Sequence, residues 1–157
     1  MIIDHKAFIT SLHYFTWGEA LYLPSYDTYH IPTDEEIANI IELAGRLDRA
    51  RVLLSVPFKI NCWIRPTSVN CSNPKFQGKN YNLLVGGAKN SSHINGCAVD
   101  FIAVGLSVDE AQNILKPMLP SYKIAMELNG KVVKRNWLHA QSRPLPSSVT
   151  PYRFFLP

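Results

Sequence analysis

Two histidines and one aspartate have the side chains and the placement of a metal-ligand set. His93 stands at the end of a long polar stretch, Asp100 follows seven residues later between Val99 and Phe101, and His139 lies in a later apolar segment. A carboxylate in an apolar segment is costly to desolvate unless it meets a cation or hydrogen-bond donors. Zinc binds imidazole nitrogen and carboxylate oxygen, and a catalytic site leaves its fourth position open.

Taken singly, each of these residues also has an ordinary structural explanation. A histidine beside Ser and Asn side chains is often only hydrogen-bonded at the surface, and a buried aspartate often caps a turn. The H-x6-D spacing with a distant histidine leaves both explanations open. If residues 137–141 form a strand, Trp137, His139 and Gln141 share one face of it, so that the histidine can point into a site.

Two capping boxes predict the helices of the fold. Thr33 stands three residues before Glu36, and apolar residues then recur at helical spacing, which predicts a helix over 34–50. Ser107 with Glu110 predicts a second helix, which Pro117 and Pro120 end.

Alternating or apolar segments predict four strands, at 58–65, 98–104, 122–128 and 137–141. Residues 66–97 between the first two strands are rich in Asn, Ser, Gly and Lys, which predicts a long loop that is either functional or mobile, with uncertain structure around 81–85. Asn129-Gly130 is a turn signal between the last two strands. We expect an α+β fold with a small antiparallel sheet, flanking helices and a long active-site loop.

The two ends of the chain have less regular patterns. The first 32 residues are rich in aromatic side chains, and we expect them to wrap around the domain as loops with one helical turn. The tail, 142–157, is rich in Pro and Ser, and we expect it to lie across the surface.

Composition excludes several classes of protein but indicates no chemistry. The chain has 157 residues, about one domain, and we expect a single domain over 1–157. A formal charge of +4 is too small to indicate a nucleic-acid binder, and no apolar run reaches the roughly 18 residues of a membrane span. The three cysteines form no C-x-x-C pair, which argues against a disulfide framework or an all-cysteine metal site.

Four segments of the chain resemble the zinc D-Ala-D-Ala peptidases, the M15 peptidases. The run 85–101 is similar to their S-x-H-x-x-G-x-A-x-D signature, and Trp137-Leu138-His139 is similar to their W-x-H motif. Residues 60–70, INCWIRPTSVN, resemble the strand with Arg-Pro-x-x-Asn that precedes the signature. Residues 15–21, FTWGEAL, resemble the opening segment of the branch that contains bacteriophage endolysins. The resemblance implies the hedgehog/D-Ala-D-Ala-peptidase-like fold.

Carried over by position, the resemblance implies one zinc ion with His93, Asp100 and His139 as its ligands. It also implies that Arg65 and Ser91 hold the carboxylate or carbonyl of the substrate, which suits a forked guanidinium and a neighbouring hydroxyl donor. Without the resemblance, the sequence around Arg65 favours a surface arginine beside a proline. We expect the Trp137 side chain to form a wall beside the site.

The general base is the point at which the chain departs from the family pattern. Several members carry Glu three residues before the last histidine, where this chain has Asn136, which cannot take a proton from water. Other relatives have a Glu in the preceding strand, so Glu127 is our candidate. Its alternative is an ordinary solvated side chain on the outer face of that strand.

The resemblance implies a zinc metallopeptidase acting on the stem peptide of peptidoglycan, as a phage endolysin endopeptidase. The alternatives are a D-Ala-D-Ala carboxypeptidase and a non-catalytic, zinc-stabilised wall-binding or virion module. The start of the chain has no signal-peptide pattern, so we expect synthesis in the host cytoplasm and action on the wall or within a virion. We expect a monomer without nucleic-acid partners or stable membrane insertion.

Overall fold

A five-stranded mixed sheet carries the fold in the computed structural model, which describes residues 3–128, 136–146 and 149–156. In spatial order its strands are β3 (Phe58–Cys62), β4 (Ala98–Ala103), β6 (Leu138–Gln141), β5 (Ala125–Glu127) and β7 (Phe154–Phe155). Neighbouring strands run antiparallel except β5 and β7, which are parallel. The α+β prediction is confirmed, and the sheet is mixed rather than purely antiparallel.

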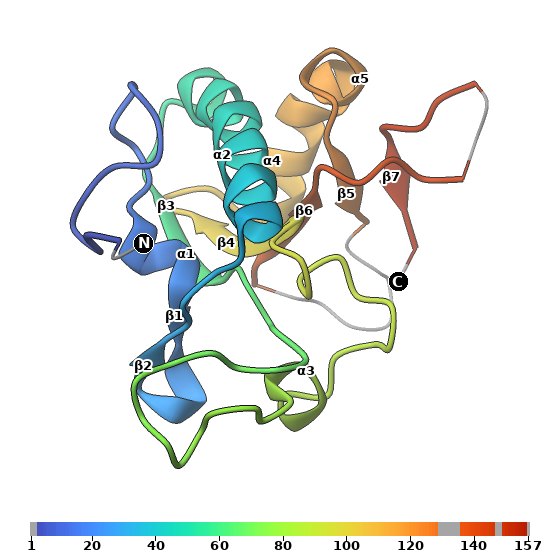
Figure 1. Ribbon diagram of the computed structural model, residues 1–157. Coiled ribbons are helices and arrows are strands. Elements are labelled where there is room, and N and C mark those ends of the chain that lie inside the picture. Colours follow the sequence, from blue (N-terminus) through green and yellow to red (C-terminus); the bar gives the residue numbers. More distant parts are fainter. Residues whose placement is uncertain (1–2, 129–135, 147–148, 157) are drawn as a thin grey trace.

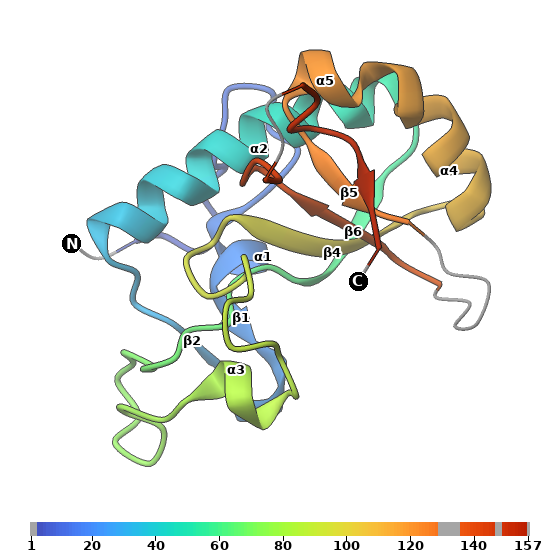
Figure 2. The same cartoon turned by 90° about the vertical axis from the view of Figure 1, so that its right-hand side faces the viewer.

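The longest helix, α2 (Asp34–Leu54), packs along one face of this sheet (Figure 2). Both halves of its capping box form: the Thr33 hydroxyl accepts from the Glu36 backbone N–H at 3.3 Å, and the Glu36 carboxylate accepts from the Thr33 N–H at 2.7 Å. The helix ends one turn beyond the predicted position. Exposed Val52 and Leu53 break the apolar spacing in that turn, which is why the sequence pattern ended early.

The second capping box also forms, and α4 (Val108–Leu115) begins after Ser107. The two prolines that follow do not end helical structure. They lie in the first turns of two further short helices, η2 (Lys116–Met118) and α5 (Leu119–Tyr122), since a proline fits the first turn, where no N–H is needed. The predicted strand over 122–128 was therefore too long at its start. Helices α2, α4 and α5 lie together on one side of the sheet (Figure 2).

The amino-terminal residues form a small layer beside the edge strand β3 (Figure 1). This layer contains α1 (Trp17–Leu21), η1 (Pro24–Tyr26) and the two-stranded sheet of β1 (Tyr22–Leu23) and β2 (Thr28–Tyr29). The expectation of loops with one helical turn was therefore incomplete, because these short elements are stabilised by contacts with distant residues. The Ala20 carbonyl, for example, accepts from the Ile64 N–H at 3.4 Å.

The predicted strand over 58–65 stops at Cys62. A register shift between Ile60 and Cys62 marks a bulge, and Trp63 and Ile64, adjacent in sequence, are both fully buried. Trp63 lies edge-on to Phe15 with ring centroids 5.8 Å apart. The segment after the bulge therefore leaves the sheet and packs into the core.

The long loop after β3 contains one short helix, α3 (Tyr81–Leu84). The carboxyl-terminal tail crosses the surface as expected, but it also contributes β7 to the sheet. The predicted turn at Asn129-Gly130 lies outside the described residues. Among the described residues no helix is both long and apolar enough to cross a membrane.

The cap of α2 provides a test of this arrangement. Thr33→Ala removes the hydroxyl acceptor, and we expect the free energy of unfolding to fall by about 1 kcal/mol, which lowers the melting temperature by about 2–4 °C for a chain of this size. Thermal and urea unfolding followed by circular dichroism measures the change. Thr67→Ala, in an exposed loop position, is the control, and an equal loss in both variants would contradict the role of the cap.

Candidate metal centre

The register between β4 and β6 brings two of the three predicted ligands together. Asp100 and His139 are direct cross-strand partners, so their side chains share one face of the sheet. The His139 Nδ1 and Asp100 Oδ1 atoms are 2.8 Å apart. This face is opposite the one that carries the aromatic core, where Phe101 stacks on Phe58 at 4.4 Å.

The third residue, His93, reaches the pair from the end of the long loop. Its side chain is 1% exposed, and its Nδ1 lies 2.6 Å from the Trp63 carbonyl oxygen, to which it donates in the corresponding tautomer. That hydrogen bond leaves the Nε2 lone pair free for a metal. Burial lowers the pKa of His93, which favours the neutral imidazole that a ligand requires. Gly96, at φ +75°, turns the chain after His93.

The three ligand atoms lie slightly closer together than the ligand atoms of a tetrahedral ion. His93 Nε2 lies 3.2 Å from His139 Nδ1 and 3.4 Å from Asp100 Oδ1. Bonds of 2.0–2.2 Å at tetrahedral angles place ligand atoms roughly 3.3–3.6 Å apart, so His139 Nδ1 and Asp100 Oδ1, which are 2.8 Å apart, would separate slightly when an ion binds. Two imidazoles and a carboxylate on one cavity wall therefore fit a zinc ion with an open position. In the described part of the chain this is the group of three His, Cys, Asp or Glu side chains whose ligand atoms all lie within 4.8 Å of one another.

The charge of Asp100 is compensated on both sides. Burial by itself would raise the pKa of this carboxyl, but the adjacent imidazoles of His139 and His93 hold it well below its usual range. Its second oxygen, Oδ2, accepts a hydrogen bond from Arg65 Nη2. Arg65 Nε in turn donates to Cys62 Sγ at 3.2 Å. Arg65 therefore contacts a ligand of the candidate centre, a contact that the sequence interpretation did not include.

A cavity of about 390 Å³ opens beside the cluster. It is lined by every residue that the sequence interpretation assigned to the site: Arg65, Ser91, His93, Asp100, Glu127, Trp137 and His139. Ser91 Oγ also accepts from the His93 backbone N–H at 3.3 Å. Asn136, at the family's usual position for a base, is exposed and is not among these lining residues.

Two glycines shape the loop on one side of the cavity. Gly86 has φ +72°, which favours glycine. A Cβ added to Gly87 would lie 2.0 Å from Asn82 Oδ1, so no larger residue fits there without movement. Asn82 donates to the Ala88 carbonyl at 3.0 Å, which fixes the loop against α3. Both glycines therefore shape the backbone of this loop.

Phe155 is a cavity residue that sequence reasoning missed. It pairs with Glu127 in the parallel register of β7 and β5, and its ring lies 6.1 Å from that of His139, nearly perpendicular to it. The local signal was the pair of adjacent aromatic residues, Phe154 and Phe155, in a tail rich in Pro and Ser. Nothing local indicated a strand partner, because β7 depends on pairing with a segment 28 residues away, Phe154 against Met126.

Some histidines lie apart from the site. His30 is buried and joins two segments: its Nδ1 accepts from the Asn70 N–H at 3.1 Å, and its Nε2 lies 3.2 Å from the Glu36 carboxylate. This role is structural. His13 is exposed and stacks on Phe8 at 4.7 Å.

The cluster predicts one zinc ion per chain. We expect His93→Ala and His139→Ala each to lower zinc affinity by at least about 100-fold, because each removes one of three protein ligands. Isothermal titration and metal analysis measure this. The control is His13→Asn, since asparagine tolerates the positive φ of that position. Unchanged affinity in either alanine variant would contradict the ligand set.

Comparison with known families agrees with this geometry. The family model described as Peptidase M15 matches residues 30–141, which include the three clustered residues as well as Arg65 and Glu127. Comparisons with curated proteins and with solved structures returned no match. Because the model covers well over half of the chain, the chain belongs to the M15 peptidase family.

Proposed function

We propose that the protein is a zinc peptidase that hydrolyses peptide bonds in the stem peptide of peptidoglycan, as an endopeptidase of the endolysin type. The observation that carries the proposal is the cluster of His93, Asp100 and His139 on the wall of a cavity, in a chain of the M15 peptidase family. The cluster supports the assignment of a metal, and membership of the family supports the assignment of peptide hydrolysis.

A zinc ion held by the three residues would polarise the scissile carbonyl and acidify water at the open position. The protein groups have separate tasks. His93 and His139 stay neutral as ligands, and Asp100 supplies a negative charge that offsets part of the cation. Burial of His93, which lowers its pKa, supports the first of these roles.

Glu127 is the proposed general base. The β5–β6 register pairs Met126 with Ala140, so the next pair in that register is Glu127 with His139. Adjacent strands are about 4.8 Å apart, which supports a position of the carboxylate within reach of water at the centre. Glu127 would accept a proton from the attacking water and pass it to the leaving amine. Gln112 donates to the Glu127 carbonyl at 2.8 Å and fixes the backbone of this short strand.

Arg65 and Ser91 are the proposed substrate-orienting residues. Arg65 Nη2 donates to Asp100 and Nε donates to Cys62, but a guanidinium has five N–H donors, and those of Nη1 can bind a substrate carboxylate or carbonyl. The Ser91 hydroxyl accepts from the His93 N–H and retains its own hydrogen for donation. Trp137 and Phe155 supply apolar walls on the other side.

Replacement of the base tests the proposal. We expect Glu127→Gln to lower the rate of wall hydrolysis by about 10²–10⁴-fold with unchanged zinc content, because the amide cannot accept the proton. The measurement is loss of turbidity of permeabilised cells, with chelator and zinc re-addition in parallel. Glu35→Gln, an exposed position on α2, is the matched control and is expected to retain full activity.

The same experiment separates the alternatives. Full activity in Glu127→Gln would overturn the base assignment. Mass spectrometry of released wall fragments distinguishes an endopeptidase, which cuts within stem peptides or their cross-links, from a carboxypeptidase, which releases only terminal D-Ala. A zinc-loaded wild-type chain that binds the wall without hydrolysing it would favour the non-catalytic module.

A further inference from the structure

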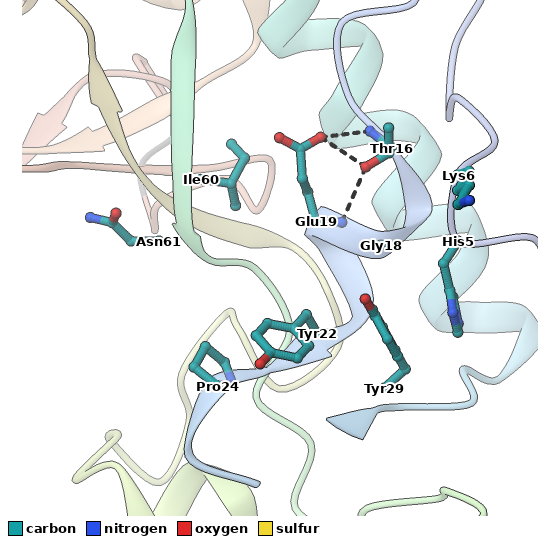
Figure 3. A pocket seen from close by; sticks show the side chains of 10 residues that line it. All are labelled: His5, Lys6, Thr16, Gly18, Glu19, Tyr22, Pro24, Tyr29, Ile60 and Asn61. Carbon is teal, nitrogen blue, oxygen red and sulfur yellow. Dashed lines mark hydrogen bonds between the residues drawn. The ribbon is translucent and has the colours of Figure 1, made fainter. Parts of the chain in front are cut away.

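A second cavity, of about 580 Å³, lies at the outer edge of β3 and shares no lining residue with the cavity at the metal cluster. Figure 3 shows its walls, formed by the amino-terminal loop, α1, the β1–β2 sheet and two residues of β3. Nearly all of its wall precedes residue 30, where the family match begins. The cavity is therefore largely a contribution of the part of this chain outside the matched region.

Aromatic rings form one side of this cavity. His5 stacks on Tyr29 with ring centroids 3.9 Å apart and planes 18° from parallel, and Tyr22 lies 5.3 Å from Tyr29 at a tilt of 51°. Tyr29 is 40% exposed although it is a large aromatic side chain. Rings of this kind offer a flat apolar surface with a polar tip, and such residues are frequent in binding sites.

Charged side chains of both signs line the same cavity. The Glu19 carboxylate uses Oε2 to accept from Thr16, and Figure 3 shows its other oxygen turned away from that bond. Lys6 contributes an ammonium, and Asn61 also lines the cavity, with its amide on the other side of β3 from Glu19 (Figure 3). Among the hydrogen bonds and ion pairs of the described residues, none joins the side chains of Lys6, Tyr29 or Asn61 to another group.

This combination restricts the chemistry of a ligand. An anion would face the Glu19 carboxylate, a cation would face the Lys6 ammonium, and a purely apolar ligand would desolvate both charges without compensation. A pyranose ring is neutral, has an apolar face for Tyr22 and Tyr29, and carries hydroxyl and acetamido groups that both donate and accept. An N-acetylated sugar therefore matches both the tyrosine rings and the charged groups that line this cavity.

Residues that line the two cavities lie close together along the chain. Asn61 in one and Arg65 in the other are four residues apart, so their Cα atoms are at most about 14 Å apart. An extended peptide gains at most about 3.6 Å per residue, so a stem peptide of about four residues can cover a comparable distance. In peptidoglycan the stem peptide is attached to an N-acetylated amino sugar. One polymer can therefore occupy both cavities.

We propose that the cavity at the edge of β3 binds the N-acetylhexosamine glycan strand of peptidoglycan while the attached stem peptide reaches the metal centre. This inference rests on the proposed function for the identity of the polymer. Glycan binding by the cavity itself needs no hydrolysis, so the two proposals can fail separately.

The test uses the full-length, zinc-loaded chain and a soluble β-1,4-linked N-acetylglucosamine tetramer. We expect saturable binding in an NMR titration, with shifts at Tyr22, Tyr29 and Asn61, and a loss of affinity of about tenfold in Tyr29→Ala. Phe8→Ala is the matched control, because Phe8 is 49% exposed and also stacks on a histidine, but it does not line the cavity. Asn61→Ala, at an exposed edge position, is a second variant that preserves the core.

A second measurement connects the cavity with catalysis. We expect Tyr29→Ala to slow hydrolysis of intact wall by about tenfold and to leave kcat/KM for a glycan-free stem peptide unchanged. Absence of saccharide binding, or equal affinity in Tyr29→Ala and Phe8→Ala, would overturn the inference. So would binding of the glycan-free peptide at Tyr29. Saccharide binding without hydrolysis of any peptide would support the cavity and contradict the proposed peptidase.

Discussion

The candidate site depends on one structural constraint, the antiparallel register that sets Asp100 on β4 opposite His139 on β6. On the same face, Cys62 pairs with Asp100 on one side, and Glu127 pairs with Phe155 on the other. A transverse row of side chains thus crosses the whole sheet from β3 to β7. Because a slip of one residue turns every side chain of a strand to the opposite face, the aromatic core on the other face fixes the site as well.

Electrostatic interactions stabilise the Asp100 carboxylate in its buried position. Asp100 is 8% exposed and would be costly as an isolated charge, but it is held between Arg65 and the two imidazoles. Removing Arg65 or one imidazole would leave the buried Asp100 carboxylate without full compensation for its lost hydration. A divalent cation bound at the cluster would stabilise this carboxylate further, and metal affinity and folding stability would then be coupled.

The sequence was most informative where local rules apply. Capping boxes identified α2 and α4, and the motif around His93 and Asp100 identified residues that the structure brings together. It was least informative where pairing is long-range: β7 depends on a partner 28 residues away, and the bulge before Cys62 depends on the burial of Trp63 behind it. The cavity at the edge of β3 was missed for the same reason, since its aromatic residues come from segments that carry no motif.

The central claim is that two histidines and one aspartate form a zinc centre. X-ray absorption at the zinc edge of the reconstituted protein tests it most directly. We expect only nitrogen and oxygen neighbours at about 2.0–2.2 Å, with the nitrogen contribution reduced in His139→Ala. A sulfur neighbour at about 2.3 Å, for which Cys62 is the nearest source beside Asp100, or a spectrum unchanged in that variant, would contradict it.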